Sequence, residues 1–328
     1  MRQLSDKIKK DKRISQMNKI LIIGSSNMDL SMNMYKLPLP GETITDDGGV
    51  AYTPGGKGAN AALTFKKLGA DAVFCTKLGA DMHGQKLYGY FKEAGLNTSY
   101  IKVDRDNPTG FAAVIKESGG QNRIVYYPGA NTFLSRENLL EAFASCPDAV
   151  YINFEVSFDV AMTAARIAAD RGIPIFIDAA PADRETSLES LPPLEVFSPN
   201  ETETQCYTGI TPAGADTSLR AALALWKRVK CKYLVIKQGA RGSFVYDGKH
   251  YSMIPAYRAD KVVDTTAAGD IFTAAMTLEY MRAGGDIVAA VKYGAAAAAV
   301  SVSRSGAISS IPTDAEINDL IIRRPEQQ

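Results

Sequence analysis

The chain has 328 residues, of which 46% are hydrophobic and 22% charged, with a formal net charge of +1. This length suits one large α/β domain or two ordinary domains of a soluble globular protein. The balanced charge argues against nucleic acid or a membrane surface as partner, and no apolar run approaches the roughly 18 residues that a membrane span needs.

The first 17 residues are basic and lack the apolar segment of a signal peptide. We expect them to form a flexible N-terminal extension before a single domain that spans residues 18–324. A contact of this extension with nucleic acid is the alternative reading of its charge.

The first polar cluster follows the first predicted strand. Residues 19–24 are an apolar run typical of a buried parallel strand, and a Ser-Ser-Asn-Met-Asp sequence comes directly after it. Ligands of open α/β sheets bind at the carboxyl ends of strands. Asn27 and Asp29 are therefore candidate hydroxyl-binding groups, with an Asx turn as the alternative.

A glycine-rich turn at residues 54–60 (PGGKGAN) precedes a helix predicted over 61–68. Glycines before a helix leave backbone N–H groups free to bind an anion or a hydroxyl, and this turn presents Lys57 and Asn60 beside them. The spacing is not that of a Walker P-loop.

Strands and helices alternate through the rest of the chain. This alternation predicts a doubly wound, mostly parallel sheet with helices on both faces. Two strand pairs, near 31–54 and 109–127, do not fit the alternation and predict a small separate β-sheet. We expect helices at 84–94 and 159–171, and strands at 72–77, 100–103, 149–153, 173–178, 195–198 and 233–237.

Three later segments admit two readings each. Glu203, near the start of a helix, can cap that helix or orient Mg²⁺ through water. Residues 237–242 (KQGARG) form either a nucleotide contact or a simple hairpin turn. The small residues at 294–300 allow either tight helix–sheet packing or contact with a flat adenine ring.

The stretch from Asp264 to Asp270 (DTTAAGD) opens an apolar helix over 271–281. A helix N-terminus offers unpaired N–H groups and a positive dipole end, and the small side chains of 267–269 let a phosphate approach the backbone. Asp270 is then a candidate general base for an attacking hydroxyl. An ordinary N-capped helix is the alternative.

In this order and at these separations, the motifs resemble those of the PfkB-type carbohydrate kinases, in particular the ribokinases, over residues 19–324. The most specific are 54–60 and 264–270. Supporting segments lie at 24–29, 109–110, 128–131, 199–203 and 237–242. The resemblance implies a ribokinase-like fold in which the small β-sheet is a lid that commonly pairs two subunits. It also implies phosphorylation of D-ribose at the 5-hydroxyl by ATP, giving D-ribose 5-phosphate and ADP.

The resemblance also implies residue roles. Asp270 would be the base, and the backbone N–H groups of Ala267, Ala268 and Gly269 the anion hole. The sugar would be bound by Asn27, Met28, Asp29, Gly56, Lys57, Gly58, Ala59, Asn60, Glu155 and Asp270. Mg·ATP would be bound by Asn200, Glu203, Lys237, Gln238, Gly239, Ala240, Arg241, Gly242, Gly269, Asp270 and Ala295. A potassium ion would be bound by Asp264, Thr266, Ser301, Arg304, Gly306 and Ser310.

Three residues depart from the family pattern. Lys237 stands where ribokinases usually carry a small hydroxyl residue. Phe111, expected to face the sugar or a partner subunit, and Phe154 also differ, which leaves open a kinase for 2-deoxyribose, fructose, inosine or a similar compound.

Two other classes of function are the further alternatives. A non-catalytic sugar or nucleotide sensor should have lost its base, yet Asp270 is present. A Rossmann dehydrogenase is disfavoured because the first strand lacks GxGxxG. The four scattered cysteines predict reduced thiols and a cytoplasmic location, and two histidines argue against a histidine metal centre or a Ser-His-Asp triad. We expect a homodimer with no nucleic-acid or membrane partner.

Overall fold

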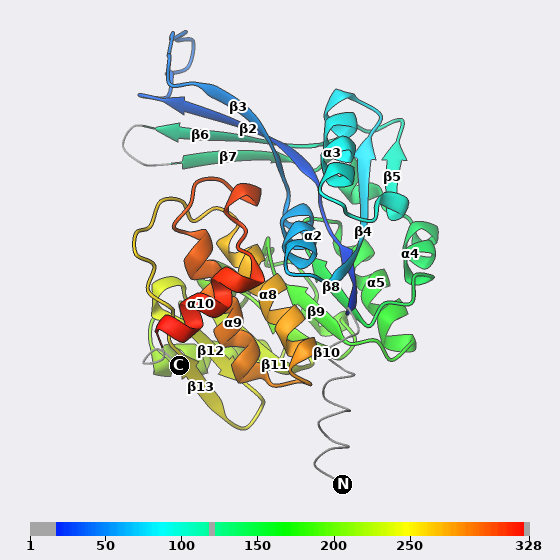
Figure 1. Ribbon diagram of the computed structural model, residues 1–328, viewed down its shortest axis with the longest axis vertical. Coiled ribbons are helices and arrows are strands. Elements are labelled where there is room, and N and C mark those ends of the chain that lie inside the picture. Colours follow the sequence, from blue (N-terminus) through cyan, green and yellow to red (C-terminus); the bar gives the residue numbers. More distant parts are fainter. Residues whose placement is uncertain (1–17, 118–121, 325–328) are drawn as a thin grey trace.

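The computed structural model describes residues 18–117 and 122–324, so the N-terminal extension expected at 1–17 lies outside the described residues. The described chain is built around a nine-stranded sheet (Figure 1). Its strands, in spatial order, are β13 (Tyr251–Ile254), β12 (Ser243–Tyr246), β11 (Cys231–Lys237), β10 (Leu194–Ser198), β9 (Ile175–Asp178), β8 (Ala149–Asn153), β1 (Lys19–Ile23), β4 (Asp71–Gly79) and β5 (Ile101–Asp104).

Strands β11 through β5 of this sheet are mutually parallel, and only the β11–β12–β13 end is antiparallel among the described residues. The predicted mostly parallel, doubly wound fold is thereby confirmed. The terminal strands β12 and β13 are an addition that the alternation of elements did not predict.

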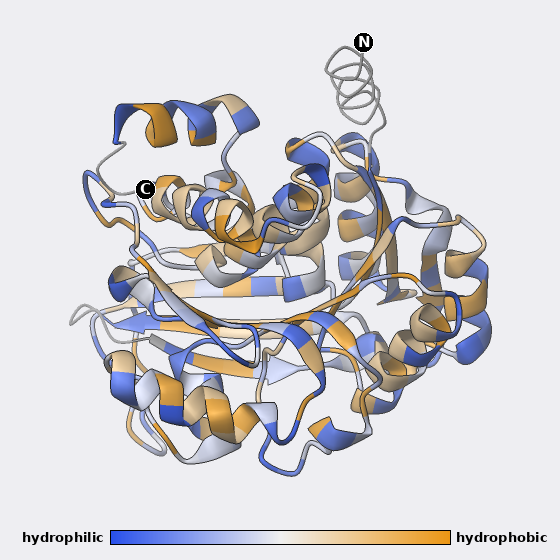
Figure 2. Cartoon of the chain, turned by 90° about the horizontal axis from the view of Figure 1, so that it is seen from below, coloured by the Kyte–Doolittle hydropathy of each residue, from blue (hydrophilic) through white to orange (hydrophobic). Residues whose placement is uncertain are grey.

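Apolar side chains alternate between the two faces of the sheet, so each face has its own core. Ile20, Ile22 and Tyr151 lie in one core, and Leu21 and Ile23 lie in the other. Figure 2 shows helices on both sides of the sheet. The first core is covered by α2 (Lys57–Lys67), α3 (Met82–Glu93), α8 (Ala268–Arg282), α9 (Ile287–Ser301) and α10 (Asp314–Arg323). The second is covered by α4 (Arg136–Phe143), α5 (Phe158–Asp170), α6 (Glu201–Thr208) and α7 (Ala215–Trp226).

The alanine-rich segment lies in α9, which packs closely against its neighbour α8. A Cβ placed on Gly294 would lie 2.7 Å from the backbone oxygen of Phe272, so only glycine allows the two helices to approach this closely. Ala295 is buried in the same core. The small residues therefore serve tight packing, which was one of the two interpretations of this segment. The packing is against a helix rather than against the sheet.

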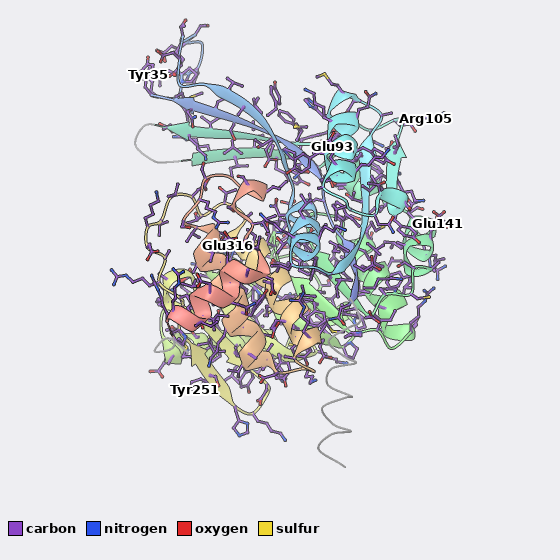
Figure 3. All side chains as sticks on the ribbon, in the orientation of Figure 1. Tyr35, Glu93, Arg105, Glu141, Tyr251 and Glu316 are labelled. Atoms are coloured by element: carbon purple, nitrogen blue, oxygen red, sulfur yellow. The ribbon has the colours of Figure 1, made fainter. Side chains whose placement is uncertain are left out.

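The predicted second sheet is present as a four-stranded lid of order β3-β2-β6-β7. Strand β2 (Asn27–Met34) pairs antiparallel with β3 (Val50–Gly55) and parallel with β6 (Gly110–Glu117), which pairs antiparallel with β7 (Asn122–Tyr127). The lid projects from the edge of the main body, and Figure 3 shows the side chain of Tyr35 at its far end. Within the described ranges, no helix is both long and apolar enough to cross a bilayer.

Candidate active site

The predicted site residues converge because parallel strands end at one edge of the sheet. Strands β1 and β8 end at this edge just before residues 25–29 and Glu155, and strands β9 and β11 end there at Asp178 and Lys237. Helices α2 and α8 begin at the same edge, with the two most specific motifs at their N-termini.

The structure brings Asp270 together with Lys57 and Asn60, although more than 200 residues separate them in sequence. Asn60 Nδ2 donates to Asp270 Oδ2 at 2.8 Å, and Lys57 Nζ lies 3.3 Å from Asp270 Oδ1. Asp270 is 4% exposed. With Asp270 and Asn60 buried and Lys57 partly exposed, the three side chains form one polar unit between the first turns of α2 and α8.

Burial raises the pKa of Asp270, and the negative charge of Asp178 adds to the rise, while the Lys57 ammonium and the Asn60 hydrogen bond act in the opposite direction. The pKa of Lys57 is raised in turn, chiefly by Asp270. A carboxylate with a raised pKa is a stronger base than an exposed aspartate, which suits proton abstraction from an alcohol.

The N-terminus of α8 is open. Its N-cap residue, Ala267, adopts a left-handed backbone with φ 62°, and no side chain caps the helix. Gly269 is exposed and Ala268 half-buried, although the Ala268 N–H donates to Thr265 O at 3.2 Å. Left-handed alanine is strained, and such strain is retained where a special backbone shape is used. The first turn of α8 can therefore receive an anion.

The sugar-side residues contain buried polar atoms without partners in the described part of the chain, among them Asp29 Oδ1 and Asn60 Oδ1. Burial, together with the charges of Glu155 and Asp270, raises the pKa of Asp29 to about 7. Buried polar atoms are normally paired, so these oxygens indicate a place for a polar ligand. A Cβ on Gly55 would overlap the Asp29 carboxylate, which explains the glycine.

Two residues that orient this group were not singled out from the sequence. Ser25 donates its hydroxyl to Glu155, whose carboxylate also accepts the Lys57 N–H at 3.0 Å. Asn131 donates to Asn27 Oδ1 at 2.8 Å. Both belong to segments that supported the family resemblance, so the sequence signal that could have identified these two residues lies in those segments.

The glycine-rich turn positions the start of α2 against β1. Gly56 has φ 96°, and a Cβ on Gly58 would lie 2.4 Å from the backbone of Gly24. Ala59 is buried and its N–H donates to Ser25 O at 2.9 Å. The helix begins at Lys57, four residues earlier than expected, which places Lys57 and Asn60 in its first turn.

Met28 and Phe111 lie on the opposite face of the lid from Asp29. They are directly paired between β2 and β6, and Phe111 lies against His83 with a 5.7 Å separation of ring centroids. Because side chains alternate along a strand, a residue next to Asp29 points away from the site. Of the two orientations expected for Phe111, the one facing the sugar is therefore wrong and the one facing a partner subunit stays a prediction. Met28 can face the sugar only through its backbone.

On the expected nucleotide side, Asn200 and Glu203 form a reciprocal capping box at the start of α6. The turn at 237–242 joins the antiparallel strands β11 and β12, so the hairpin reading holds. Gly239, Ala240 and Arg241 are exposed on this turn, and Arg241 pairs with Glu201. The Gln238 side chain is buried and donates to Ser218.

Lys237 turns its side chain inward instead of toward solvent. Its Nζ lies 2.9 Å from Asp178 Oδ1 and 3.0 Å from Thr273 Oγ1. Burial raises the pKa of Glu203, and Lys237 opposes that rise.

The segments expected to bind potassium are brought side by side. Asp264 accepts hydrogen bonds from Thr266 and from the Gly306 N–H, at 2.6 and 3.0 Å. The hydroxyls of Ser301 and Ser310 donate to nearby carbonyls and keep lone pairs on their oxygens, whereas Arg304 pairs with Glu316 and can contribute only its backbone oxygen. Among the described residues, no group of three or more His, Cys, Asp or Glu side chains is arranged to hold a metal ion.

Residues 17–314 match the family model described as pfkB family carbohydrate kinase. The chain belongs to this family. It is 33% identical over 300 residues to a ribokinase of Haemophilus influenzae, covering 90% of this chain and 96% of that protein. It is 34% identical to a bifunctional ribokinase/ribose-5-phosphate isomerase A of Fructilactobacillus sanfranciscensis, covering 93% of this chain and 56% of that longer protein.

The comparison of folds agrees with the comparison of sequences. The solved structure of Arabidopsis thaliana ribokinase complexed with ribose and ATP superposes with a TM-score of 0.84 at 30% identity, covering 93% of this chain and 99% of that one. The predicted carbohydrate-kinase family and ribokinase-like fold are thus confirmed, and the protein is a sugar kinase.

Proposed function

We propose that the protein is an ATP-dependent ribokinase that converts D-ribose to D-ribose 5-phosphate. The observation that carries this proposal is the polar unit of Asp270, Lys57 and Asn60 at the open N-terminus of α8. The ribokinases among its relatives, including the one solved with ribose and ATP, support ribose as the acceptor and ATP as the donor.

In the proposed reaction, Asp270 accepts the proton of the sugar 5-hydroxyl as the oxygen attacks the γ-phosphorus. The bond between the γ-phosphorus and the bridging oxygen breaks, and ADP leaves with the electron pair. Charge on the transferred group is stabilised by the N–H groups and dipole of α8. Lys57 and Asn60 orient the base, and in phosphoryl transfer such positioning is most of what the protein supplies.

The sugar hydroxyls would be bound by the groups around Asp29. Its unpaired Oδ1 and that of Asn60 are buried acceptors, and hydroxyl donors from a ribose would satisfy both. Glu155 and Asn27 are already oriented by Ser25 and Asn131. A ring with vicinal hydroxyls suits this convergence of carboxylates and amides.

We further propose that the lid closes over the sugar and pairs two subunits. Its strands carry exposed apolar residues, and closing lids exclude water from the phosphoryl group. These residues are Val50, Tyr52, Ile124, Val125 and Tyr127. The kinase domain of this proposal spans residues 18–324, and its reduced cysteines fit the cytoplasm.

Two ions belong to the proposal. Asn200 and Glu203 would help to hold Mg²⁺ with ATP, and the ion would supply charge to neutralise the phosphates; the Glu203 carboxylate already accepts from Asn200, so a water-mediated contact fits best. Potassium fits the oxygen-rich junction of Asp264 with the Gly306 loop, where its role is to fix the backbone before α8.

A substrate screen tests the proposal. Purified protein is given MgATP and K⁺ with D-ribose, 2-deoxyribose, fructose or inosine, and ADP release and the phosphorylated product are measured. We expect the highest kcat/KM for ribose, with phosphate on the 5-oxygen. If ribose ranks among the poor acceptors, the ribokinase proposal fails.

A further inference from the structure

A buried ion pair lies directly beside the open end of α8. Lys237 ends β11 and is 8% exposed, whereas Asp178 ends β9 and is 1% exposed. Their charged atoms lie 2.9 Å apart. We call this pair with Thr273 the lysine triad, since Lys237 Nζ also donates to Thr273 Oγ1 at 3.0 Å.

The lysine triad is connected to the backbone of the anion-binding turn. Thr273 donates its hydroxyl to Gly269 O at 3.0 Å. A Cβ built on Gly269 would lie 3.8 Å from Lys237 Nζ, which places the ammonium against the first turn of α8. The positive charge therefore adds to the positive dipole end of that helix.

Stability alone does not explain this pair. Desolvating two charges costs several kcal/mol per ion, and apolar residues in such positions are often equally stable. Ser198 Oγ, beside Asp178 in the register of β9 and β10, is also buried without a partner among the described residues. The surroundings of the pair are thus polar and incompletely satisfied, as in a site that receives a ligand.

The Lys237 ammonium can donate one more hydrogen bond. A lysine ammonium has three N–H groups, and Asp178 and Thr273 accept from two of them. Among the described residues the third N–H has no acceptor, so it can donate to an anion seated on the turn of Gly269. Asp178 cannot bind an anion itself, because a carboxylate has no N–H or O–H group to donate; it accepts a hydrogen bond from Tyr151 at 3.3 Å.

We propose that Lys237 is a phosphate-binding catalytic residue, which donates to the transferring phosphoryl group of ATP while Asp178 and Thr273 hold its ammonium in place. This inference rests on the proposed kinase function and assigns a role to a residue that departs from the hydroxyl usual at this position. Loss of one preorganised donor to developing charge lowers kcat by roughly 10²–10³-fold.

The test is the double variant Lys237→Met/Asp178→Asn, which removes both charges and the lysine donor and so leaves no unpaired buried ion. Isothermal titration calorimetry measures the binding of a non-hydrolysable ATP analogue and of adenosine. We expect analogue affinity to fall about tenfold or more with adenosine affinity unchanged, and kcat with ribose to fall by about 10²–10³-fold. Wild-type analogue affinity and kcat in the double variant would overturn the proposal.

A matched control is Lys77→Met/Asp104→Asn, whose ion pair has the same 2.9 Å separation on β4 and β5. It should leave nucleotide affinity and kcat unchanged. If the active-site double variant does not fold, ¹⁵N-lysine spectra of the wild type give the answer: the Lys237 signal, identified by its loss in Lys237→Arg, should shift with the ATP analogue and not with adenosine. An unmoved signal would exclude the contact.

The two proposals fail in different ways. A wild-type protein that phosphorylates no sugar refutes the ribokinase function, while its binding of the ATP analogue still reports on Lys237. A protein active on ribose whose double variant is equally active refutes only the role of Lys237.

Discussion

The substitution Asp270→Asn separates the proton-accepting role of Asp270 from its hydrogen bonding and its volume. The amide keeps an oxygen that can accept the Asn60 hydrogen bond, now 2.8 Å long, and it fills the same buried volume. It cannot accept a proton at neutral pH. The variant should therefore bind ribose within a few-fold of the wild type while losing the proton-transfer contribution to catalysis.

The expected loss in kcat is roughly 10²–10⁴-fold, the usual contribution of a general base. This corresponds to about 3–5 kcal/mol of transition-state stabilisation. Lys57, 3.3 Å from the carboxylate, loses its counter-ion, so its pKa falls and some stability is lost as well. Denaturant unfolding measured beside the kinetics separates that loss from the catalytic effect.

The assay is steady-state ADP release at saturating ribose and MgATP, with ribose affinity from calorimetry. Glu279→Gln is the matched control, because Glu279 lies on the same helix and burial likewise raises its pKa. The control should keep kcat. Turnover of the Asp270→Asn variant within threefold of the wild type would remove Asp270 from the chemistry.

Three further predictions concern the surroundings of the base. The folded pKa of Asp29, about 7, exceeds its ordinary value of 3.8, so the native state binds more protons than the unfolded state between these values and loses stability as pH rises. Asp29→Asn should hence gain in melting temperature over the wild type from pH 4 to pH 8; a constant difference would contradict this. Gly110→Ala puts a Cβ 2.2 Å from Asn131 Nδ2 and should lower kcat/KM for ribose by about 10²-fold, whereas Gly89→Ala, with open space at its Cβ, should not. A potassium titration at fixed MgATP should raise kcat, and Asp264→Asn should weaken that response; activity indifferent to K⁺ and Cs⁺ would refute the cation proposal.

The sheet was predictable because its strands are apolar runs separated by helices, and this alternation has few solutions. Strand β12 was implied only by the hairpin interpretation of residues 237–242, and β13 was missed because it has only four residues. The lid was predicted as a separate sheet, but not the parallel pairing of β2 with β6. The orientation of Phe111 could not be predicted because the register of its strand was not known, and a shift of one residue turns a side chain to the opposite face.

The candidate site likewise contains residues that could be predicted from the sequence and residues that could not. Lys57, Asn60 and Asp270 could be named because each stands at a helix start, where local sequence indicates an anion or hydroxyl site. The pairing of Lys237 with Asp178 could not, since 59 residues and strand β10 separate them. The sequence motif predicted that Lys237 belongs to a turn near the nucleotide. The inward direction of its ammonium follows only from the packing of α8 against the sheet.

Two ion pairs lie near the start of α8: Asp270 pairs with the partly exposed Lys57, and Asp178 pairs with Lys237 in the interior. Removing one member leaves the other unpaired, which typically costs 3–5 kcal/mol and lowers activity through misfolding as readily as through chemistry. A single loss-of-charge variant of Lys237 is therefore uninformative by itself. Neutralising both members of the Lys237 pair leaves no unpaired buried ion, whereas Asp270→Asn keeps the hydrogen bond and removes only the proton acceptor. If both variants remain folded and each still loses turnover, the charges act on the reaction rather than on the structure.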